Sequence, residues 1–221
     1  MEKKVFLRRT LMSFFGVIVC AISVGIFKIA ALGVDPFQSL MSGLDKLIPI
    51  QFGTLYVIVN VLLLSFAFFT DRHYIGLATF INMFLLGYIT QFTYEQLQKV
   101  FVNPSMIMRV ICLIVGIVII CFGSAFYMTA DLGVSTYDAV ALVLSNKYKV
   151  GPFKFVRIGT DVVCVILGVV IFVIGGGLFS QIPEIAGIGT IITAFFMGPL
   201  IDYFNNKFAI PFLNKVKDQA E

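Results

Sequence analysis

The stretch ALGVDPFQSLMSGL at Ala31–Leu44 decides the fold, because it returns as DLGVSTYDAVALVL at Asp131–Leu144. A second stretch, GLATFINMFLLG at Gly76–Gly87, returns as IGTIITAFFMG ending at Gly198. The copies lie 100 residues apart in the first block and 111 in the second, so they differ mainly by a glycine-rich insertion around 175–184. An internal repeat of this kind indicates two units of similar structure.

Composition identifies the medium in which these units fold. Hydrophobic residues make up 59% of the chain and charged residues only 13%, and the mean hydropathy is +1.00. A soluble domain could not bury that much apolar surface, so we expect an all-α integral membrane protein. Six apolar runs are long enough to cross a bilayer: 10–31, 54–70, 75–94, 107–130, 155–177 and 185–204. Three fall in a first repeat (1–100) and three in a second (101–205), followed by a short cytoplasmic tail (206–221).

The distribution of lysine and arginine predicts the orientation. Twelve basic residues fall at the two termini and in the loops that these six spans place on the same side, and only Lys46, Lys99 and Arg109 fall on the other. This bias predicts cytoplasmic N- and C-termini in a bacterial plasma membrane, and the net charge of +4 gives no argument for nucleic-acid binding. Because each repeat has an odd number of spans, the second copy must enter the membrane from the opposite face. The repeats are therefore expected to be inverted.

The repeated loop predicts a helix stop followed at once by a helix start. Gly33 and Gly133 are typical of helix ends, whereas Asp35 and Ser135 are typical N-caps, each followed three residues later by Gln or Asp. The short helices expected at 36–48 and 136–147 have two interpretations that stay open. They are interfacial amphipathic helices, or they are re-entrant half-helices at matching positions of two repeats, which is typical of transporter binding sites.

Polar residues inside apolar spans are the candidate site residues, since charge in hydrocarbon is costly. Asp161 lies about 12 Å from the cytoplasmic end of its span, and Asn60 occupies the matching place in the first repeat. These two side chains are expected to meet near the midplane. The alternative is a structural ion pair between Asp161 and Arg157, one turn earlier.

Other polar positions are weaker candidates. Asp138 either contributes to the site or only caps its helix, and Asn82 aligns with Thr193 of the second repeat. Lys28 either snorkels or pairs with Asp35. Thr79 and Thr190 match between the repeats, as do Gly87 and Gly198, and predict close helix packing at small residues.

Catalytic and cofactor signatures are absent from the sequence. There is no Walker-type loop, no GxGxxG after a strand, no HExxH and no CxxC, so we expect neither an enzyme nor a bound cofactor or metal. The four cysteines all lie in apolar spans and are interpreted as small core residues.

The Leu-Gly-x-x-Pro-Phe stretch at 32–37, Gly53 with Thr54, and Gly159 to Asp161 resemble the YitT/YczE-type family of small bacterial multi-pass membrane proteins, as does Gly-x-Gly-Thr with Gly-Pro at 187–199. The chain is more similar to the YczE-like branch, because it stops soon after Lys217. The second copy has Ser135 and Thr136 where the first has Asp35 and Pro36. The resemblance implies a plasma-membrane protein and no particular substrate.

The sequence thus favours a small secondary transporter with alternating access around a midplane site. Its partners would be a small solute or ion, with proton coupling through Asp161, and the lipid bilayer; a homodimer is a reasonable assembly. The helix starts at Asp35 and Ser135 would offer N–H groups to an anionic portion of the substrate. The alternatives are a channel, a non-transporting membrane scaffold or regulator, and a binding subunit of an ATP-driven importer.

Overall fold

The computed structural model describes residues 3–217, and throughout these residues the regular structure is helical. The long helices are α1 (Lys3–Ala30), α3 (Phe52–Thr70), α4 (Leu77–Val100), α5 (Met106–Thr129), α7 (Phe153–Ile174) and α9 (Ile188–Phe204). The short ones are α2 (Pro36–Leu47), η1 (Arg72–Tyr74), α6 (Thr136–Asn146), η2 (Phe179–Gln181), α8 (Ile182–Ile185), η3 (Asn205–Ala209) and α10 (Ile210–Lys217). The all-α prediction is confirmed.

Five helical segments are long and apolar enough to cross a membrane. They are α1, α3, α5, the 155–174 part of α7, and a segment from Phe179 to Asn214 that contains α9. The sixth predicted span corresponds to α4, which has 24 residues but is not among these five. Asn82, Thr90 and Gln91 make α4 more polar than its counterparts.

Several helix boundaries differ from the predicted spans. Helix α1 begins at Lys3 and not near residue 10. The predicted span covers only the apolar part that crosses the bilayer, whereas the polar turns before it are also helical. The predicted tail is helical from 206 to 217. Its Ala209 and Leu213 pack against Met12 and Ala125, so this segment adds a second apolar cluster beside the ends of α1 and α5.

The repeated loops have the same backbone conformation in both copies. Ala31 and Gly33 have φ values of 49° and 102°, and Asp131 and Gly133 have 52° and 105°. Asp35 then caps α2 by accepting from the backbone N–H of Gln38 at 3.2 Å. Ser135 caps α6 in the same way through the N–H of Asp138 at 3.1 Å. The predicted stop and start are confirmed in both copies.

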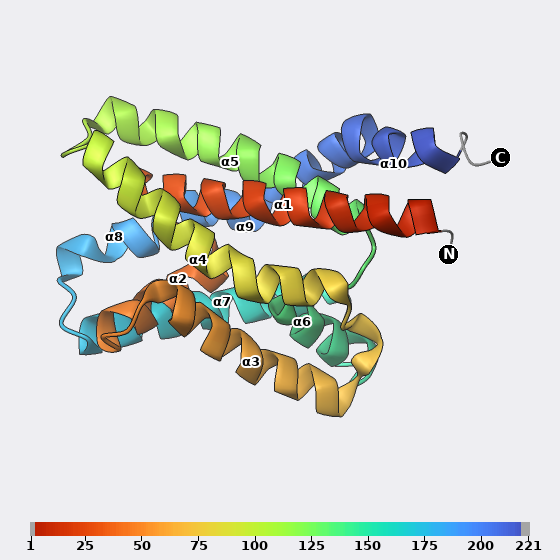
Figure 1. Cartoon of the computed structure of the whole chain (residues 1–221). Coiled ribbons are helices and arrows are strands. Elements are labelled where there is room, and N and C mark those ends of the chain that lie inside the picture. The colour runs from red at the N-terminus through yellow and green to blue at the C-terminus, as the bar shows by residue number, and fades with distance from the viewer. Residues whose placement is uncertain (1–2, 218–221) are drawn as a thin grey trace.

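The helices pack across the two copies more than within them. Helix α1 crosses α5 at glycines, where a Cβ on Gly16 would lie 2.6 Å from the carbonyl oxygen of Gly123. Helix α2 of the first copy packs on α7 of the second, and α6 of the second copy packs on α3 of the first. Starting near the middle of the molecule, α2 runs toward one end and α6 toward the other (Figure 1). The two short helices therefore have their N-termini together in the interior.

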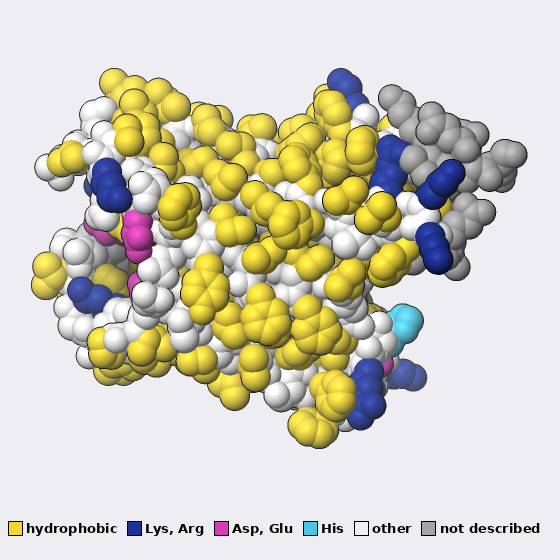
Figure 2. All heavy atoms as spheres, viewed as in Figure 1, with side chains coloured by type: hydrophobic (Ala, Val, Ile, Leu, Met, Phe, Trp, Pro, Cys, Tyr) yellow, Lys and Arg dark blue, Asp and Glu magenta, His cyan; other side chains and the backbone are white. Residues whose placement is uncertain are grey.

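The surface agrees with a membrane protein. In the view of Figure 2, hydrophobic side chains cover the middle of the molecule, and the lysine and arginine side chains lie toward its two ends. Both chain ends lie at the same end of the bundle (Figure 1). The four cysteines are free and buried, as core residues should be.

Candidate functional site

The candidate site lies where the N-terminal turns of α2 and α6 meet. Phe37 and Tyr137 occupy equivalent positions of the two sequence copies, and their rings stack with centroids 5.0 Å apart and an interplanar angle of 18°. Tyr56 of α3 packs edge-on against Phe37 with centroids 5.9 Å apart. All three side chains are buried. This aromatic contact fixes the two helix starts relative to each other.

Each glycine turn docks on the helix start of the other copy. The N–H of Ala78 in α4 donates to Leu132 O at 2.9 Å, and the N–H of Gly189 in α9 donates to Leu32 O at 2.7 Å. A Cβ on Gly33 would lie 2.6 Å from the backbone nitrogen of Gly187. The two turns therefore need glycine both for their φ values and for this close approach.

Thr79 and Thr190 form hydrogen bonds where the glycine turns contact α4 and α9. The hydroxyl of Thr79 donates to Val134 O at 2.6 Å and accepts from the N–H of Gly76 at 3.1 Å. Thr190 accepts from the N–H of Gly187 at 3.2 Å. The predicted close packing of the third and sixth spans at these small residues is not observed among the described residues; instead, α4 and α9 each pack on the glycine turn of the opposite copy.

Asp161 lies at the centre of the polar network. It is 9% exposed, and its Oδ1 accepts from the Tyr137 hydroxyl at 2.6 Å. Nε of Arg157 lies 3.4 Å from the same oxygen, which is the ion pair that the sequence left as an alternative. Among the described side chains, which leave out those of 154 and 215–217, none donates a hydrogen bond to Oδ2 of Asp161. One carboxylate oxygen is therefore free to accept from a ligand.

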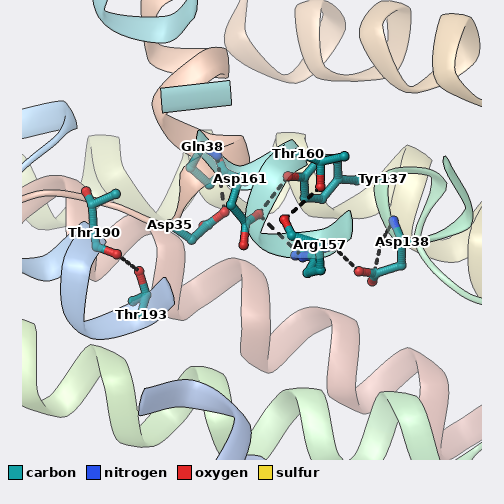
Figure 3. A network of polar contacts seen from close by, with 10 residues as sticks. Asp35, Gln38, Tyr137, Asp138, Arg157, Thr160, Asp161, Thr190 and Thr193 are labelled. Atoms are coloured by element: carbon teal, nitrogen blue, oxygen red, sulfur yellow. Dashed lines mark hydrogen bonds and ion pairs between the residues drawn. The ribbon is translucent and has the colours of Figure 1, made fainter. Parts of the chain in front are cut away.

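Arg157 extends the network to Asp138. Its Nη1 pairs with Asp138 Oδ1, and its guanidinium carbon lies 4.2 Å from the centroid of the Tyr137 ring. The other oxygen of Asp138 accepts from the Ser135 hydroxyl at 2.6 Å. Figure 3 shows these contacts in line, from Tyr137 and Asp161 through Arg157 to Asp138. Asp138 thus pairs with Arg157 and accepts from the hydroxyl of Ser135, which is the residue that caps α6.

Asn60 lies on the other side of α6. Its side-chain oxygen accepts from the buried Thr136 hydroxyl, and its amide donates to Tyr56 O at 2.7 Å. The Tyr56 hydroxyl donates to Oδ1 of Asn82 at 3.3 Å. Asn60 and Asp161 share no hydrogen bond within residues 3–217, although we expected them to meet. Instead they bind consecutive residues of α6, Thr136 and Tyr137, whose side chains project about 100° apart around the helix axis.

The Asp35 side chain caps α2 and is already engaged in a hydrogen bond. Its carboxylate accepts from the N–H of Gln38 and lies within electrostatic reach of Arg157 and Asp161. Of the two alternatives for Lys28, the pair with Asp35 is not formed, since no ion pair in the described part of the chain joins them. Lys28 Nζ lies 3.3 Å from the centroid of the Phe52 ring, so its partner is aromatic.

A crevice of about 210 Å³ lies beside this network and reaches it at Asp161. It is lined by Pro36, by α7 residues between Ile158 and Ile166, and by α9 residues between Thr190 and Phe195. We call it the α7/α9 crevice. Asp161 and Thr190 are the polar side chains in its lining, and the rest is apolar. The crevice is half-open, so a ligand could reach Asp161 without unfolding a helix.

In the first copy, the helices equivalent to α7 and α9 are α3 and α4, and these two helices are closely packed. Helices α3 and α4 pack together, and a Cβ on Gly87 would lie 2.6 Å from Cβ of Tyr56 and 3.1 Å from Cα of Gly53. Its counterpart Gly198 has no atom within 4 Å of a Cβ built there. Helices α7 and α9 make at most slight contact along the residues described. Equivalent helix pairs therefore differ, one packed and one open.

The family follows from a comparison of sequences. The profile of a family described as "Family of unknown function (DUF6198)" matches residues 7–206. The chain belongs to this family. Its relatives agree with the resemblance drawn from the loop motifs, which is thereby confirmed.

Three relatives cover most of the chain. The uncharacterized protein YyaS of Bacillus subtilis (strain 168) is 24% identical over 86% of this chain and 88% of its own length. The uncharacterized membrane protein YczE of the same organism is 25% identical over 92% and 87%. An uncharacterized protein of Haemophilus influenzae is 23% identical over 87% and 81%. No solved structure matches this DUF6198 chain.

Sequence reasoning missed three members of the network. Tyr137, Thr136 and Tyr56 were not among the candidate site residues, because hydroxyl side chains on helices usually pack or bond their own backbone. One signal was present for Tyr137, since its hydroxyl is the only chemical difference from Phe37 at the equivalent position. That difference coincides with the presence of Asp161 in the second copy and Asn60 in the first.

Proposed function

We propose that this protein is a small secondary transporter that alternates access to a site around Asp161. The chain would form six spans in two inverted three-helix repeats, with α4 as the sixth span and α2 and α6 as re-entrant half-helices. Both termini would be cytoplasmic in a bacterial plasma membrane. Support comes from the matched glycine turns, the interior position of both short helices and the one-sided distribution of basic residues.

The observation that carries the proposal is the difference between the two equivalent helix pairs. Inverted repeats with identical conformations would leave a site equally open or closed on both sides. Here α3 and α4 are closed around Gly87, while α7 and α9 are open at the level of Asp161. In transporters built from inverted repeats, exchanging the conformations of the repeats moves the opening to the other side. The arrangement fits one of these two states.

Charge favours a cation or proton as the transported or coupling species. Asp35, Asp138 and Asp161 share the network with a single cation, Arg157. At each helix N-terminus, which the sequence suggested as an anion donor, one N–H is already bonded to its own cap, Asp35 or Ser135. An anion would therefore meet excess negative charge and fewer donors. Carboxylates in a membrane interior are typical of proton and cation pathways.

Alternation can be tested without knowing the substrate. Spin labels would be placed, in a variant with its cysteines replaced, on Phe155 of α7 and Phe196 of α9, both exposed. A matched pair would be placed on Leu62 of α3 and Phe84 of α4, also exposed. Pulsed electron paramagnetic resonance would then measure both distances in lipid vesicles at acidic and alkaline pH.

We expect two distance populations in each pair that change in opposite directions, and a shift of both by Asp161→Asn. A single distance in each pair under every condition would overturn the proposal. That outcome would make the Arg157–Asp161 pair structural and would favour the scaffold alternative.

A further inference from the structure

We infer that the α7/α9 crevice binds small amphipathic cations, with the free oxygen of Asp161 as their anionic contact. This inference rests on the proposed function only in that the bound molecule would be the transported one. Binding itself depends on the crevice and its carboxylate. Neither the family nor the relatives assign any ligand to this position.

The walls of the crevice predict the apolar part of the ligand. Val162, Ile166, Ile191 and Phe195 line it, and each is at least half exposed. In a membrane-spanning bundle, side chains exposed at this level face hydrocarbon and not water. The crevice therefore opens laterally, and its entrance selects molecules that can partition into the bilayer.

Asp161 predicts the charge of the ligand. This residue is nine-tenths buried and lines the crevice, and its Oδ1 already binds Tyr137 and Arg157. None of the described side chains donates to Oδ2. Because Oδ2 is not among the fully buried side-chain atoms that lack a partner, it keeps some exposed surface, and a ligand that supplies an N–H there gains a charge-assisted hydrogen bond.

The surrounding charges exclude the opposite sign. Arg157 is shared between Asp161 and Asp138, and Asp35 adds a third carboxylate within electrostatic reach. A ligand ammonium would bring the ratio of negative to positive groups from three to one to three to two. A carboxylate ligand would make it four to one in a medium of low dielectric constant.

The volume limits the size of the ligand. About 210 Å³ lies below the 300–1,000 Å³ of pockets for drug-sized molecules. The crevice therefore suits an amine with one ring or a short alkyl chain. Primary amines of this size supply both the N–H donors and the apolar body that the crevice requires.

The test uses three probes of similar shape and different charge: 2-phenylethylammonium, 2-phenylethanol and 3-phenylpropanoate. Thermal unfolding of the detergent-purified protein would be recorded over a concentration series of each. Any ligand that binds only the folded state raises the midpoint, and above the dissociation constant the rise grows with the logarithm of the ligand concentration. We expect such a rise for 2-phenylethylammonium alone.

Two substitutions of the same kind locate the binding. Val162→Phe fills the crevice, whereas Val170→Phe changes a similarly exposed valine of α7 that does not line it. The cation-induced shift should disappear in Val162→Phe and remain in Val170→Phe. Asp161→Asn should also abolish the preference for the cation. If that variant does not fold, the comparison of Val162→Phe with Val170→Phe still shows whether the cation binds in the crevice.

Equal shifts from all three probes, or a cation shift that persists in Val162→Phe, would overturn the inference. Absence of any shift in the wild type would also overturn it. These outcomes leave the distance measurements untouched, so they reject this ligand class without rejecting transport. Conversely, cation binding together with fixed helix distances would retain the site and reject alternation.

Discussion

Phe37 and Tyr137, which stand 100 residues apart at the same position of the two sequence copies, stack on each other with ring centroids 5.0 Å apart. The stack joins the starts of α2 and α6 in the interior. Of the two rings, only Tyr137 carries a hydroxyl, and it binds Asp161. The contact between equivalent residues is therefore also the point at which the two copies become chemically different.

Tyr137→Phe should separate these two roles, because it keeps the stack and removes the donor to Asp161. A hydrogen bond to a charged group contributes about 2 kcal/mol, and we expect the free energy of unfolding to fall by that order. Chemical unfolding in detergent measures it, with Tyr148→Phe, at an exposed tyrosine, as the control. An unchanged stability would mean that water replaces the hydroxyl without loss.

Arg157→Gln should destabilise the protein more than the loss of an arginine from an exposed ion pair would, since Asp138 and Asp161 lose their shared cation. Breaking a buried pair costs about 3–5 kcal/mol, and the 31% exposure of the Arg157 side chain reduces this to about 2 kcal/mol. Adding Asp161→Asn to Arg157→Gln should recover part of the loss. If the double variant is less stable than the single one, the charges do not interact as described.

Gly33→Ala should be poorly tolerated, because φ is 102° and the added Cβ would lie 2.6 Å from Gly187 N. Strain of this kind costs at least about 2 kcal/mol. Gly159→Ala provides the control, since it lies within α7 with no atom within 4 Å of a built Cβ. It should stabilise the helix by up to about 1 kcal/mol. The comparison uses yield and unfolding midpoint, and equal effects at the two sites would contradict the docked turn.

Gly87→Ala and Gly198→Ala should differ in the same way. The first forces α4 away from Tyr56 and should lower the unfolding midpoint, whereas the second meets open space. If α9 closes onto α7 during transport, the larger Gly198→Leu should leave stability nearly unchanged but shift the α7–α9 distance population toward the open state. A shift in the α3–α4 pair alone would contradict this assignment.

Much of the fold could be predicted from the sequence because it depends on local rules. Gly33 and Gly133 stop a helix, Asp35 and Ser135 start the next, and both events occur as expected. The apolar runs gave the long helices to within a few residues at most ends. The start of α1 was misplaced because helical structure does not end where hydrophobicity does.

The site was less predictable because its partners are distant in the chain. Asp161 and Arg157 were paired correctly from their spacing of four residues. The Thr136–Asn60 and Tyr137–Asp161 contacts depend on which face of α6 meets α3 and which meets α7, and periodicity alone does not determine that. Whether Lys28 snorkels or pairs with Asp35 was likewise left open by the sequence, and in the structure its Nζ lies 3.3 Å from the centroid of the Phe52 ring.

The sequence by itself determined that the chain is a helical membrane protein built from two related copies, because hydropathy and turn chemistry act over one helix at a time. Only the tertiary structure decided that the two short helices meet at Phe37 and Tyr137, and that Asp138, Arg157 and Asp161 form one network. It alone also shows that one helix pair is closed and its equivalent is open. These features arise from packing between segments about 100 residues apart, where side-chain shape selects among arrangements that the same pattern of apolar residues would allow.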